Sequence, residues 1–391
     1  MPMSPDPTPA ADPGRPLSIA MISDDFLPAA TGVGTHLQTI CPQLVDRGHR
    51  VAVLTSRLSG EPERDVWRGV DVHRAPTLRV AGFDQALPGS ARLAAWLDEV
   101  RPDVVHLHYL GVMMLRAMRR CRARGLPMVY TYHMTEDHLT QPWFMRPLRW
   151  PIAAGIDRVV NRMHSVISVS EGMTTAIHRR GARVPVETIT NPVELPALDS
   201  VVPAERDGDF VVLYAGRLEP EKNLPLLLDA FALLARKVPG AVLWIAGRGS
   251  QREKLGQRAA SLGIADRVRW LGFLGREALL SRYLGCDVFV LPSLVETQGL
   301  VAMEAAWAGR PLVVADSVVS APELVESGRN GWIVDHRAPA EMFDALSRLA
   351  ADRDLGTRLG DEGRRLAAQW NVDAVIPRLV AHYGQAAGRA G

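Results

Sequence analysis

Short apolar runs, rich in β-branched and aromatic residues, alternate along the chain with segments in which apolar residues recur every three to four positions. The first pattern is typical of buried strands, and the second is typical of amphipathic helices. Their alternation predicts parallel α/β construction. In the first half of the chain, the predicted strands span residues 17–23, 51–55, 104–109, 128–133, 166–170 and 186–190.

The same pattern restarts in the second half. There the predicted strands span residues 210–215, 242–246, 268–271, 288–291, 312–315 and 332–334. Residues 191–208 carry several prolines and charged residues without periodicity. We therefore place the junction between two domains in this segment.

The predicted fold class is two doubly wound, Rossmann-like α/β domains in series. Ligands in such sheets bind at the carboxyl ends of the strands, so we expect the two edges to face each other across a cleft. The predicted boundaries are a disordered tail over 1–16, an N-terminal domain over 17–195 and a C-terminal domain over 205–371.

Composition agrees with this organisation and narrows the function. The 391 residues, 47% of them apolar, suffice for two domains. A net charge of +2 with mixed signs excludes the uniformly basic surface of a nucleic-acid binder. Between residues 101 and 183, thirteen arginines stand against five carboxylates. That excess indicates a domain facing an anionic partner, although solvated helix faces are the commoner explanation for any single cluster.

The cysteines and the termini bear on the compartment. Cys41, Cys121 and Cys286 match neither a disulfide framework nor a zinc spacing, so we expect them to be reduced and buried. Residues 1–16 are rich in proline and aspartate, which predicts a disordered tail and excludes a secretory signal. No run approaches the ~18 apolar residues that span a bilayer. We expect a cytoplasmic protein with at most a peripheral membrane contact.

The first candidate loop follows the first predicted strand and contains Gly32-Val33-Gly34 before a helical pattern. Glycines at such a turn let backbone amides approach a phosphate or a sugar. The third glycine of a dinucleotide fingerprint is missing, and no acidic residue is evident after the second strand, which disfavours a nicotinamide site. Gly32 is the candidate binding position, and a tight turn without a ligand is the alternative.

A second candidate loop follows the strand at 210–215 and carries Arg217 and Lys222. Together these cations could hold two phosphates, the arginine by a bidentate fork and the lysine as a point charge. The chain has three lysines against 42 arginines, so a lysine in this loop is notable. The alternative is a solvated helix start in which Glu219 and Glu221 are the partners.

A third candidate loop runs from Ser293 to Glu304, after a strand and into a helix. Amides near Gln298, Gly299 and Leu300 would point at an anion. A carboxylate on a mostly apolar helix needs hydrogen-bond donors, and ribose hydroxyls supply them. We therefore assign glutamates to hydroxyls and the Arg217 and Lys222 pair to phosphates. The alternative is that Glu304 caps a neighbouring backbone group.

His133 ends a predicted strand of the first domain and is the candidate for contact with a sugar hydroxyl or the acceptor. A structural histidine would have the same appearance, and His106 and His108 favour the structural interpretation more strongly. The Asp207-Gly208-Asp209 sequence lies in the linker without further ligands nearby, so no metal site is predicted.

As a set, these loops resemble the retaining GT-B glycosyltransferases of family 4, which include glycogen synthase-like enzymes, mannosyltransferases and diacylglycerol glucosyltransferases. The decisive pattern is Glu-x7-Glu at Glu296 and Glu304. The resemblance implies that Arg217 and Lys222 contact the donor diphosphate, that Glu304 binds the ribose, and that Glu296 lies near the donor sugar. It implies catalytic roles for His133, Arg217, Lys222 and Glu296. The implied donor-binding residues are Gly32, Arg217, Lys222, Phe273, Leu274, Glu296, Gln298, Gly299, Leu300 and Glu304.

The resemblance also suggests that a long helix from about Leu359, in particular residues 372–391, packs back onto the first domain. No cofactor is implied beyond the nucleotide-diphosphate sugar itself. The leaving phosphate is expected to act as the base on the same face, after the domains have closed and excluded water.

Two details are similar to the lipid-directed branch of the family: a single Gly32-Val33, and the sequence Glu296-Thr297-Gln298-Gly299-Leu300. Residues 142–150 interleave aromatic and cationic side chains, which suits an anionic membrane interface, and the arginines of 113–124 add to them. The predicted acceptor and membrane residues are His133, Trp143, Phe144, Arg146, Arg149 and Trp150. An ordinary surface helix with core tryptophans is the alternative.

Together with the resemblance, these observations predict transfer of a hexose from a nucleotide-diphosphate sugar, UDP-glucose-like, to a glycerolipid such as diacylglycerol. The reaction is expected on the cytoplasmic face of the membrane. A mannosyltransferase that uses GDP-mannose, or an enzyme with a soluble or polyprenyl-linked acceptor, is the main alternative. A sugar-nucleotide epimerase or a non-catalytic binder is less favoured.

Overall fold

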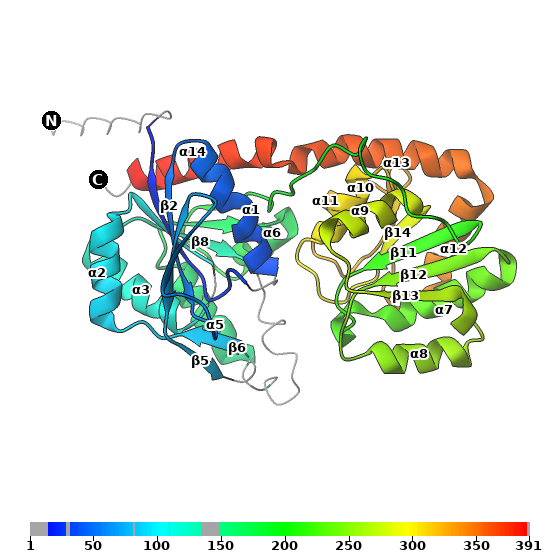
Figure 1. The fold of residues 1–391 in the computed structure, drawn as a ribbon, viewed down its shortest axis with the longest axis horizontal. Helices are drawn as coiled ribbons and strands as arrows, with labels where there is room; N and C mark the ends of the chain where they lie inside the picture. The colour runs from blue at the N-terminus through cyan, green and yellow to red at the C-terminus, as the bar shows by residue number, and fades with distance from the viewer. Residues whose placement is uncertain are drawn as a thin grey trace. The chain divides into compact units, whose positions relative to one another are not determined.

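The computed structural model describes residues 15–28, 32–80, 83–108, 110–133, 147 and 149–388. The chain divides into two compact units (Figure 1). The first unit comprises Met1–Val169, Thr174–Pro192 and Val372–Gly391. The second comprises Ser170–Met173 and Val193–Asn371.

Among the described residues, the first unit contains an eight-stranded sheet in the order β10-β9-β8-β7-β1-β2-β4-β3. Every neighbouring pair is parallel except β3 with β4. The chain leaves β1 toward β2 and β4, then returns to place β7 on the other side of β1, so the topological switch point lies between β1 and β7. The strands are β1 (Ser18–Ile22), β2 (Arg50–Ser56), β3 (Arg64–Trp67), β4 (Val70–Ala75), β7 (Val104–Leu107), β8 (Met128–Tyr132), β9 (Ser165–Ser168) and β10 (Val186–Thr188).

Helices cover this sheet, and α14 comes from the far end of the chain. Figure 1 shows α14 beside α1, and apolar residues of both helices join the strands in one buried cluster, among them Leu37, Ile40, Ile376 and Leu379. A separate antiparallel ribbon pairs β5 (Thr77–Val80) with β6 (Phe83–Ala86). The helices of this part are α1 (Gly32–Asp46), α2 (Ser90–Val100), α3 (Val112–Ala123), α5 (Arg149–Val160), α6 (Glu171–Arg179) and α14 (Val372–Gly388).

The second unit contains a six-stranded parallel sheet in the order β13-β12-β11-β14-β15-β16 among the described residues. Its switch point lies between β11 and β14. The strands are β11 (Phe210–Ala215), β12 (Ala241–Ala246), β13 (Val268–Gly272), β14 (Val288–Leu291), β15 (Leu312–Ala315) and β16 (Gly331–Val334).

Both faces of the second sheet are buried. Alternate residues of β11 enter two different clusters, Val212 and Tyr214 on one face and Val211 and Leu213 on the other. This explains why β11 is an unbroken apolar run. Helices α7 (Leu224–Lys237), α8 (Arg252–Ser261) and α12 (Pro339–Ala351) pack on the first face, and α9 (Arg276–Gly285), α10 (Leu300–Trp307) and α11 (Ala321–Leu324) pack on the second. Helix α13 spans Arg353–Ala367.

The structure differs from the sequence-based expectations in two places. The pattern missed β4, because His73 and Arg74 are buried in that strand and Arg74 pairs with Glu61 at 3.3 Å. The single helix expected from Leu359 to the end is wrong, because α13 ends at Ala367 and α14 begins at Val372. The break lets Trp370 enter the core of the second unit, where its carbonyl accepts the Val193 amide at 2.9 Å.

The expectation for the cysteines is confirmed, since all three are buried and free of disulfides. No helix within the described residues is both long enough and apolar enough to cross a membrane. The predicted tail over 1–16 lies outside the described residues up to position 14.

Candidate functional site

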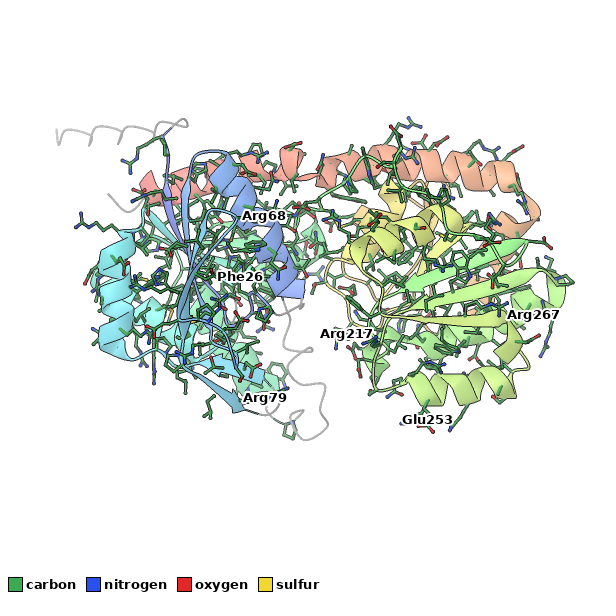
Figure 2. All side chains as sticks on the ribbon, in the orientation of Figure 1. Phe26, Arg68, Arg79, Arg217, Glu253 and Arg267 are labelled. Atoms are coloured by element: carbon green, nitrogen blue, oxygen red, sulfur yellow. The ribbon has the colours of Figure 1, made fainter. Side chains whose placement is uncertain are left out.

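The candidate charged residues of the second unit lie in the loops after β11 and β14, the two strands at the switch point. Lys222 Nζ lies 2.7 Å from Glu296 Oε2, with the two side chains only 14% and 21% exposed. Arg217 pairs with Glu221 Oε1 at 2.6 Å, and its own side chain is 69% exposed. Figure 2 shows Arg217 and Arg267 at opposite edges of this unit, because Arg217 follows β11 whereas Arg267 precedes β13.

Backbone hydrogen bonds bring the two loops together. The Leu294 amide donates to the Glu221 carbonyl at 2.8 Å, and the Val319 amide donates to the Glu296 carbonyl at 3.0 Å. The first loop turns into α7 through Asn223, whose φ of 51° lies in the left-handed region that asparagine tolerates. Lys222 and Glu296, 74 positions apart in sequence, therefore meet because of this pairing.

A close backbone approach fixes the start of the same loop. A Cβ on Gly247 would lie 1.8 Å from the Gly216 carbonyl oxygen, and both glycines have positive φ, 142° and 153°. The loops after β11 and β12 can therefore touch only as glycine backbones. Glu219 links the same two loops, because its carboxylate accepts hydrogen bonds from the Ser250 amide at 2.9 Å and from the Ser250 hydroxyl at 2.6 Å.

Gly299 is the N-cap residue of α10, with a φ of 76°. A Cβ there would lie 2.7 Å from a methyl group of Leu291, so both conformation and packing require glycine. Gln298 is buried, and its carbonyl accepts the Ser320 hydroxyl at 2.6 Å. Leu300 opens the helix, where first-turn amides lack intrahelical partners and favour an anion.

Glu304 lies one turn into α10 and accepts a hydrogen bond from the Tyr283 hydroxyl at 3.1 Å. Burial raises the pKa of Glu304, while the hydrogen bond from Tyr283 opposes the shift. Its known contact is therefore a tyrosine side chain rather than a backbone cap. Sequence reasoning missed Tyr283, because an aromatic residue on an amphipathic helix gives no signal of its polar end.

Phe273 and Leu274 come directly after β13, at the carboxyl edge of the sheet. Phe273 is 66% exposed, whereas Leu274 packs partly against the core. An exposed aromatic ring at this edge offers a flat apolar surface to a planar ligand.

Histidines dominate the corresponding edge of the first unit. His108 follows β7, His133 follows β8, and His36 lies in the first turns of α1. All are buried, and His108 Nδ1 lies 3.1 Å from His133 Nε2. Burial lowers the pKa of His133 to about 3 and the pKa of His36 and of His108 well below the usual value of 6.5. These imidazoles are neutral at pH 7.

Two further groups belong to this edge. Asp24, after β1, is 5% exposed and accepts the Ala86 amide at 2.7 Å, and burial raises its pKa to about 7. Gly32 begins α1, and a Cβ there would meet nothing within 4 Å. Packing in the described residues therefore does not require glycine at position 32.

The predicted membrane residues are only partly visible. Trp143, Phe144 and Arg146 lie outside the described residues. Arg149 begins α5, and Trp150 beside it is 82% exposed, so Trp150 is not a core tryptophan. The residues predicted for the donor loops thus lie after strands of the second unit, and His133 joins a histidine cluster in the first. Arg217 pairs with Glu221, as the alternative interpretation of its loop predicted, whereas sequence reasoning missed Tyr283, His36 and Asp24.

Two doubly wound sheets, each with a polar cluster at its switch point, are the arrangement of the GT-B fold. Solved structures share the fold across the chain. Sucrose-phosphate synthase from Thermosynechococcus elongatus has a TM-score of 0.77 at 20% identity, covering 94% of this chain and 98% of that one. HepE of Anabaena in complex with UDP and glucose has a TM-score of 0.72 at 20% identity, covering 94% and 98%.

Sequence comparison assigns the family. The model of the glycosyltransferase family 4 matches residues 30–196, and that of the glycosyl transferases group 1 matches residues 198–366. Glycogen synthase of Mycobacterium tuberculosis is 31% identical over 384 residues, 92% of each chain. A GDP-mannose-dependent α-(1-6)-phosphatidylinositol monomannoside mannosyltransferase of that organism is 27% identical, over 92% of this chain and 96% of the relative.

The chain therefore belongs to glycosyltransferase family 4. It is an enzyme that transfers a sugar from a nucleotide sugar.

Proposed function

We propose that this enzyme transfers a hexose, with retention and without a metal, from a nucleotide-diphosphate sugar such as UDP-glucose to a glycerolipid such as diacylglycerol at an anionic membrane surface. The observation that supports the donor half is the pair of cations after β11, each held by a carboxylate: Lys222 by Glu296 and Arg217 by Glu221. The exposed surface of α3 and Trp150 supports the acceptor half.

In this proposal a diphosphate displaces Glu221 from Arg217 and joins Glu296 at Lys222. Arg217 is largely exposed, so it can swing from Glu221 to a phosphate at little cost. Lys222 is mostly buried beside Glu296, so the phosphate and the carboxylate would share one ammonium. The carboxylate then faces the donor sugar and accepts from its hydroxyls. Cations and helix amides stabilise the leaving diphosphate, which is the role that a metal has in other transferases.

The remaining donor contacts follow from the second unit. Glu304, oriented by Tyr283, would accept ribose hydroxyls. The amides around Gln298, Gly299 and Leu300 would face the diphosphate, and Phe273 with Leu274 would face the base. In the first unit, Gly32 would leave room for the diphosphate or the acceptor, and neutral His133 would exchange a hydrogen bond with a sugar hydroxyl.

A lipid acceptor is supported by one stripe of α3. Val112 and Leu115 are 40% and 39% exposed, and Arg119 and Arg122 continue the same helical stripe, exposed. Apolar side chains followed by cations along one stripe suit insertion among anionic headgroups. Leu115, Arg119 and Arg122, together with Met118 and Arg162, also line a hollow of ≈ 390 Å³, which has the charge to receive a phosphate headgroup.

The test uses the full-length protein with UDP-glucose, UDP-galactose or GDP-mannose, each with and without diacylglycerol in anionic liposomes, and with EDTA. Lipid-linked sugar from one donor, insensitive to EDTA, is the expected product. Release of nucleotide without a lipid product would reject the glycerolipid acceptor and favour a soluble or polyprenyl-linked one.

Flotation with liposomes tests the surface separately. The variant Arg119→Glu with Arg122→Glu should lose flotation, whereas Arg258→Glu, on α8 of the second unit, should retain it. Wild-type protein that fails to float with anionic liposomes would contradict the membrane contact.

A further inference from the structure

Three histidines from distant parts of the first unit converge on one point. His36 comes from α1, His108 follows β7, and His133 follows β8. One ring nitrogen of each lies within 4.8 Å of the others, and the ring centroids are 5.0–5.5 Å apart. The proposed transfer uses His133 but assigns nothing to His36 or His108.

Two nitrogens of this group lack partners. His36 Nδ1 and His108 Nε2 are buried and form no hydrogen bond with any described residue. His36 is 6% exposed and His108 2% exposed, so bulk water does not compensate them. A buried nitrogen without a partner costs free energy that a bound ligand recovers.

The neighbouring His106 shows the contrast. Its Nδ1 lies 2.6 Å from the Tyr383 hydroxyl and its Nε2 lies 2.6 Å from the Thr131 hydroxyl. His106 is therefore a satisfied structural histidine although its ring centroid is only 3.8 Å from that of His108. His36 and His108 differ from His106 in that each keeps one buried ring nitrogen without a hydrogen-bond partner among the described residues.

The possible ligand atoms of this group are all imidazole nitrogens, and the rings carry no charge. Neutral imidazole is the form that ligates a metal, and all three rings are buried, which disfavours the charged form. Imidazole ligands select Zn²⁺ and similar transition metals, whereas Mg²⁺ and Ca²⁺ require oxygen. Tetrahedral zinc with a Zn–N length of ~2.1 Å holds its ligand atoms ~3.4 Å apart. One nitrogen of each ring already lies within 4.8 Å of the others, so side-chain rotation has to bring them closer by at most ~1.4 Å.

We propose that His36, His108 and His133 form a binding site for one divalent transition-metal ion, with Zn²⁺ as the preferred ion. Three protein ligands leave a fourth position open to water or a hydroxyl. The site shares His133 with the proposed transfer, whereas His36 and His108 belong to the metal site alone, and zinc binding is tested without donor or acceptor.

A second group of possible ligands in the described residues provides the matched control. Asp316, Asp335 and His336 in the second unit also bring ligand atoms together. They are more exposed, and His336 already pairs with Asp316 at 2.7 Å. An exposed group with two carboxylates prefers harder cations and should bind zinc more weakly.

The experiment titrates ZnCl₂ into EDTA-stripped, full-length protein at pH 7.5 by isothermal titration calorimetry, with MgCl₂ as a parallel arm. One zinc ion per chain is expected, with no magnesium binding at the same site. His36→Gln and His108→Gln should each weaken zinc binding at least tenfold, whereas His336→Gln should leave it unchanged. No zinc binding, or loss of binding in His336→Gln alone, would overturn the proposal.

Crystals of wild-type protein soaked in zinc give a readout that does not depend on variants that fold poorly. An anomalous difference peak between the rings of His36, His108 and His133 is expected. A peak only at the Asp316 group, or at exposed histidines such as His178, would reject the site.

Discussion

The two units share one architecture, yet the polar clusters at their switch points are opposite in character. In the second unit the cluster is ionic, and each cation is paired with a carboxylate within 2.7 Å. In the first unit the cluster consists of buried histidines whose pKa values are lowered by burial. The same sheet edge thus presents exchangeable charges in one unit and uncharged donors and acceptors in the other.

The difference shows how one fold serves two kinds of ligand. A paired cation can be transferred to an incoming anion without a large change in net charge, which suits a diphosphate. A neutral imidazole offers one donor and one acceptor to a hydroxyl, or its acceptor nitrogen to a metal ion, without bringing a charge of its own. The chemistry therefore resides in the residues after the strands and not in the sheets.

The largest expected effect concerns stability in acid. Unfolded imidazoles bind protons as the pH falls below 6.5, whereas burial lowers the pKa of His36, His106, His108 and His133 well below that value, so these four resist protonation in the folded protein. Asp24 acts in the opposite direction, because its raised pKa favours the folded state in acid. The contribution of the histidines is complete above pH 6.5 and is lost as the pH falls below it, with each histidine that stays neutral contributing at most about 1.4 kcal/mol per pH unit.

Urea unfolding between pH 7.5 and 5 measures this effect. A free energy of unfolding that stays constant down to pH 5 would show that the histidines are protonated in the folded protein, and the contrast between the units would fail.

The next largest effect concerns the ionic cluster. Lys222→Ala should lower kcat by ~10²–10³-fold, because it removes a preorganised charge from the leaving diphosphate. Lys254→Ala, at an exposed position of α8, is the control and should keep normal activity. Initial rates with saturating donor distinguish the two, and circular dichroism confirms the fold. Near-normal turnover in Lys222→Ala would place the diphosphate elsewhere.

A smaller effect is expected at the neutral cluster. His133→Asn should reduce kcat about tenfold, the equivalent of ~1.4 kcal/mol for one buried hydrogen bond, with little change in donor affinity. Since the pKa of His133 is about 3, the rate profile from pH 6 to 8 should show no inflection that disappears in the variant. Such an inflection would indicate that His133 acts as a proton carrier.

The smallest effect concerns the orientation of Glu304. Tyr283→Phe should raise the donor KM about threefold to tenfold with kcat nearly unchanged, because it removes one hydrogen bond to a charged group. Glu304→Gln should raise the KM further. An equal fall in kcat and kcat/KM in Tyr283→Phe would mean that Tyr283 acts in the transition state, not by positioning Glu304.

Sequence patterns predicted the fold class because buried parallel strands are continuous apolar runs, as in β11 and β14. They failed for β4, where the charged side chain of Arg74 is buried because it pairs with Glu61. The periodicity of apolar residues does not reveal such a pair. Motifs also placed Arg217, Lys222, Glu296 and Glu304 near one another, because all follow strands of one sheet.

The pairing of particular side chains could not be predicted in the same way. The contact of Lys222 with Glu296 depends on the Leu294 amide reaching the Glu221 carbonyl, a tertiary bond without a local signal. The histidine cluster likewise joins three segments, and each histidine in isolation had an ordinary structural interpretation.

Helix α14 has a consequence for biosynthesis. Its residues are made only after the whole second unit, yet Ile376 and Leu379 complete the core of the first unit. Tyr383 and His382 also bond to His106 and Ser165 at 2.6 Å and 2.9 Å. On the ribosome, the N-terminal unit waits with an incomplete core while the whole second unit emerges and folds. The usual order, in which the N-terminal domain matures first, is reversed, and a chain released early at Pro192 would carry an uncovered apolar face to the chaperones.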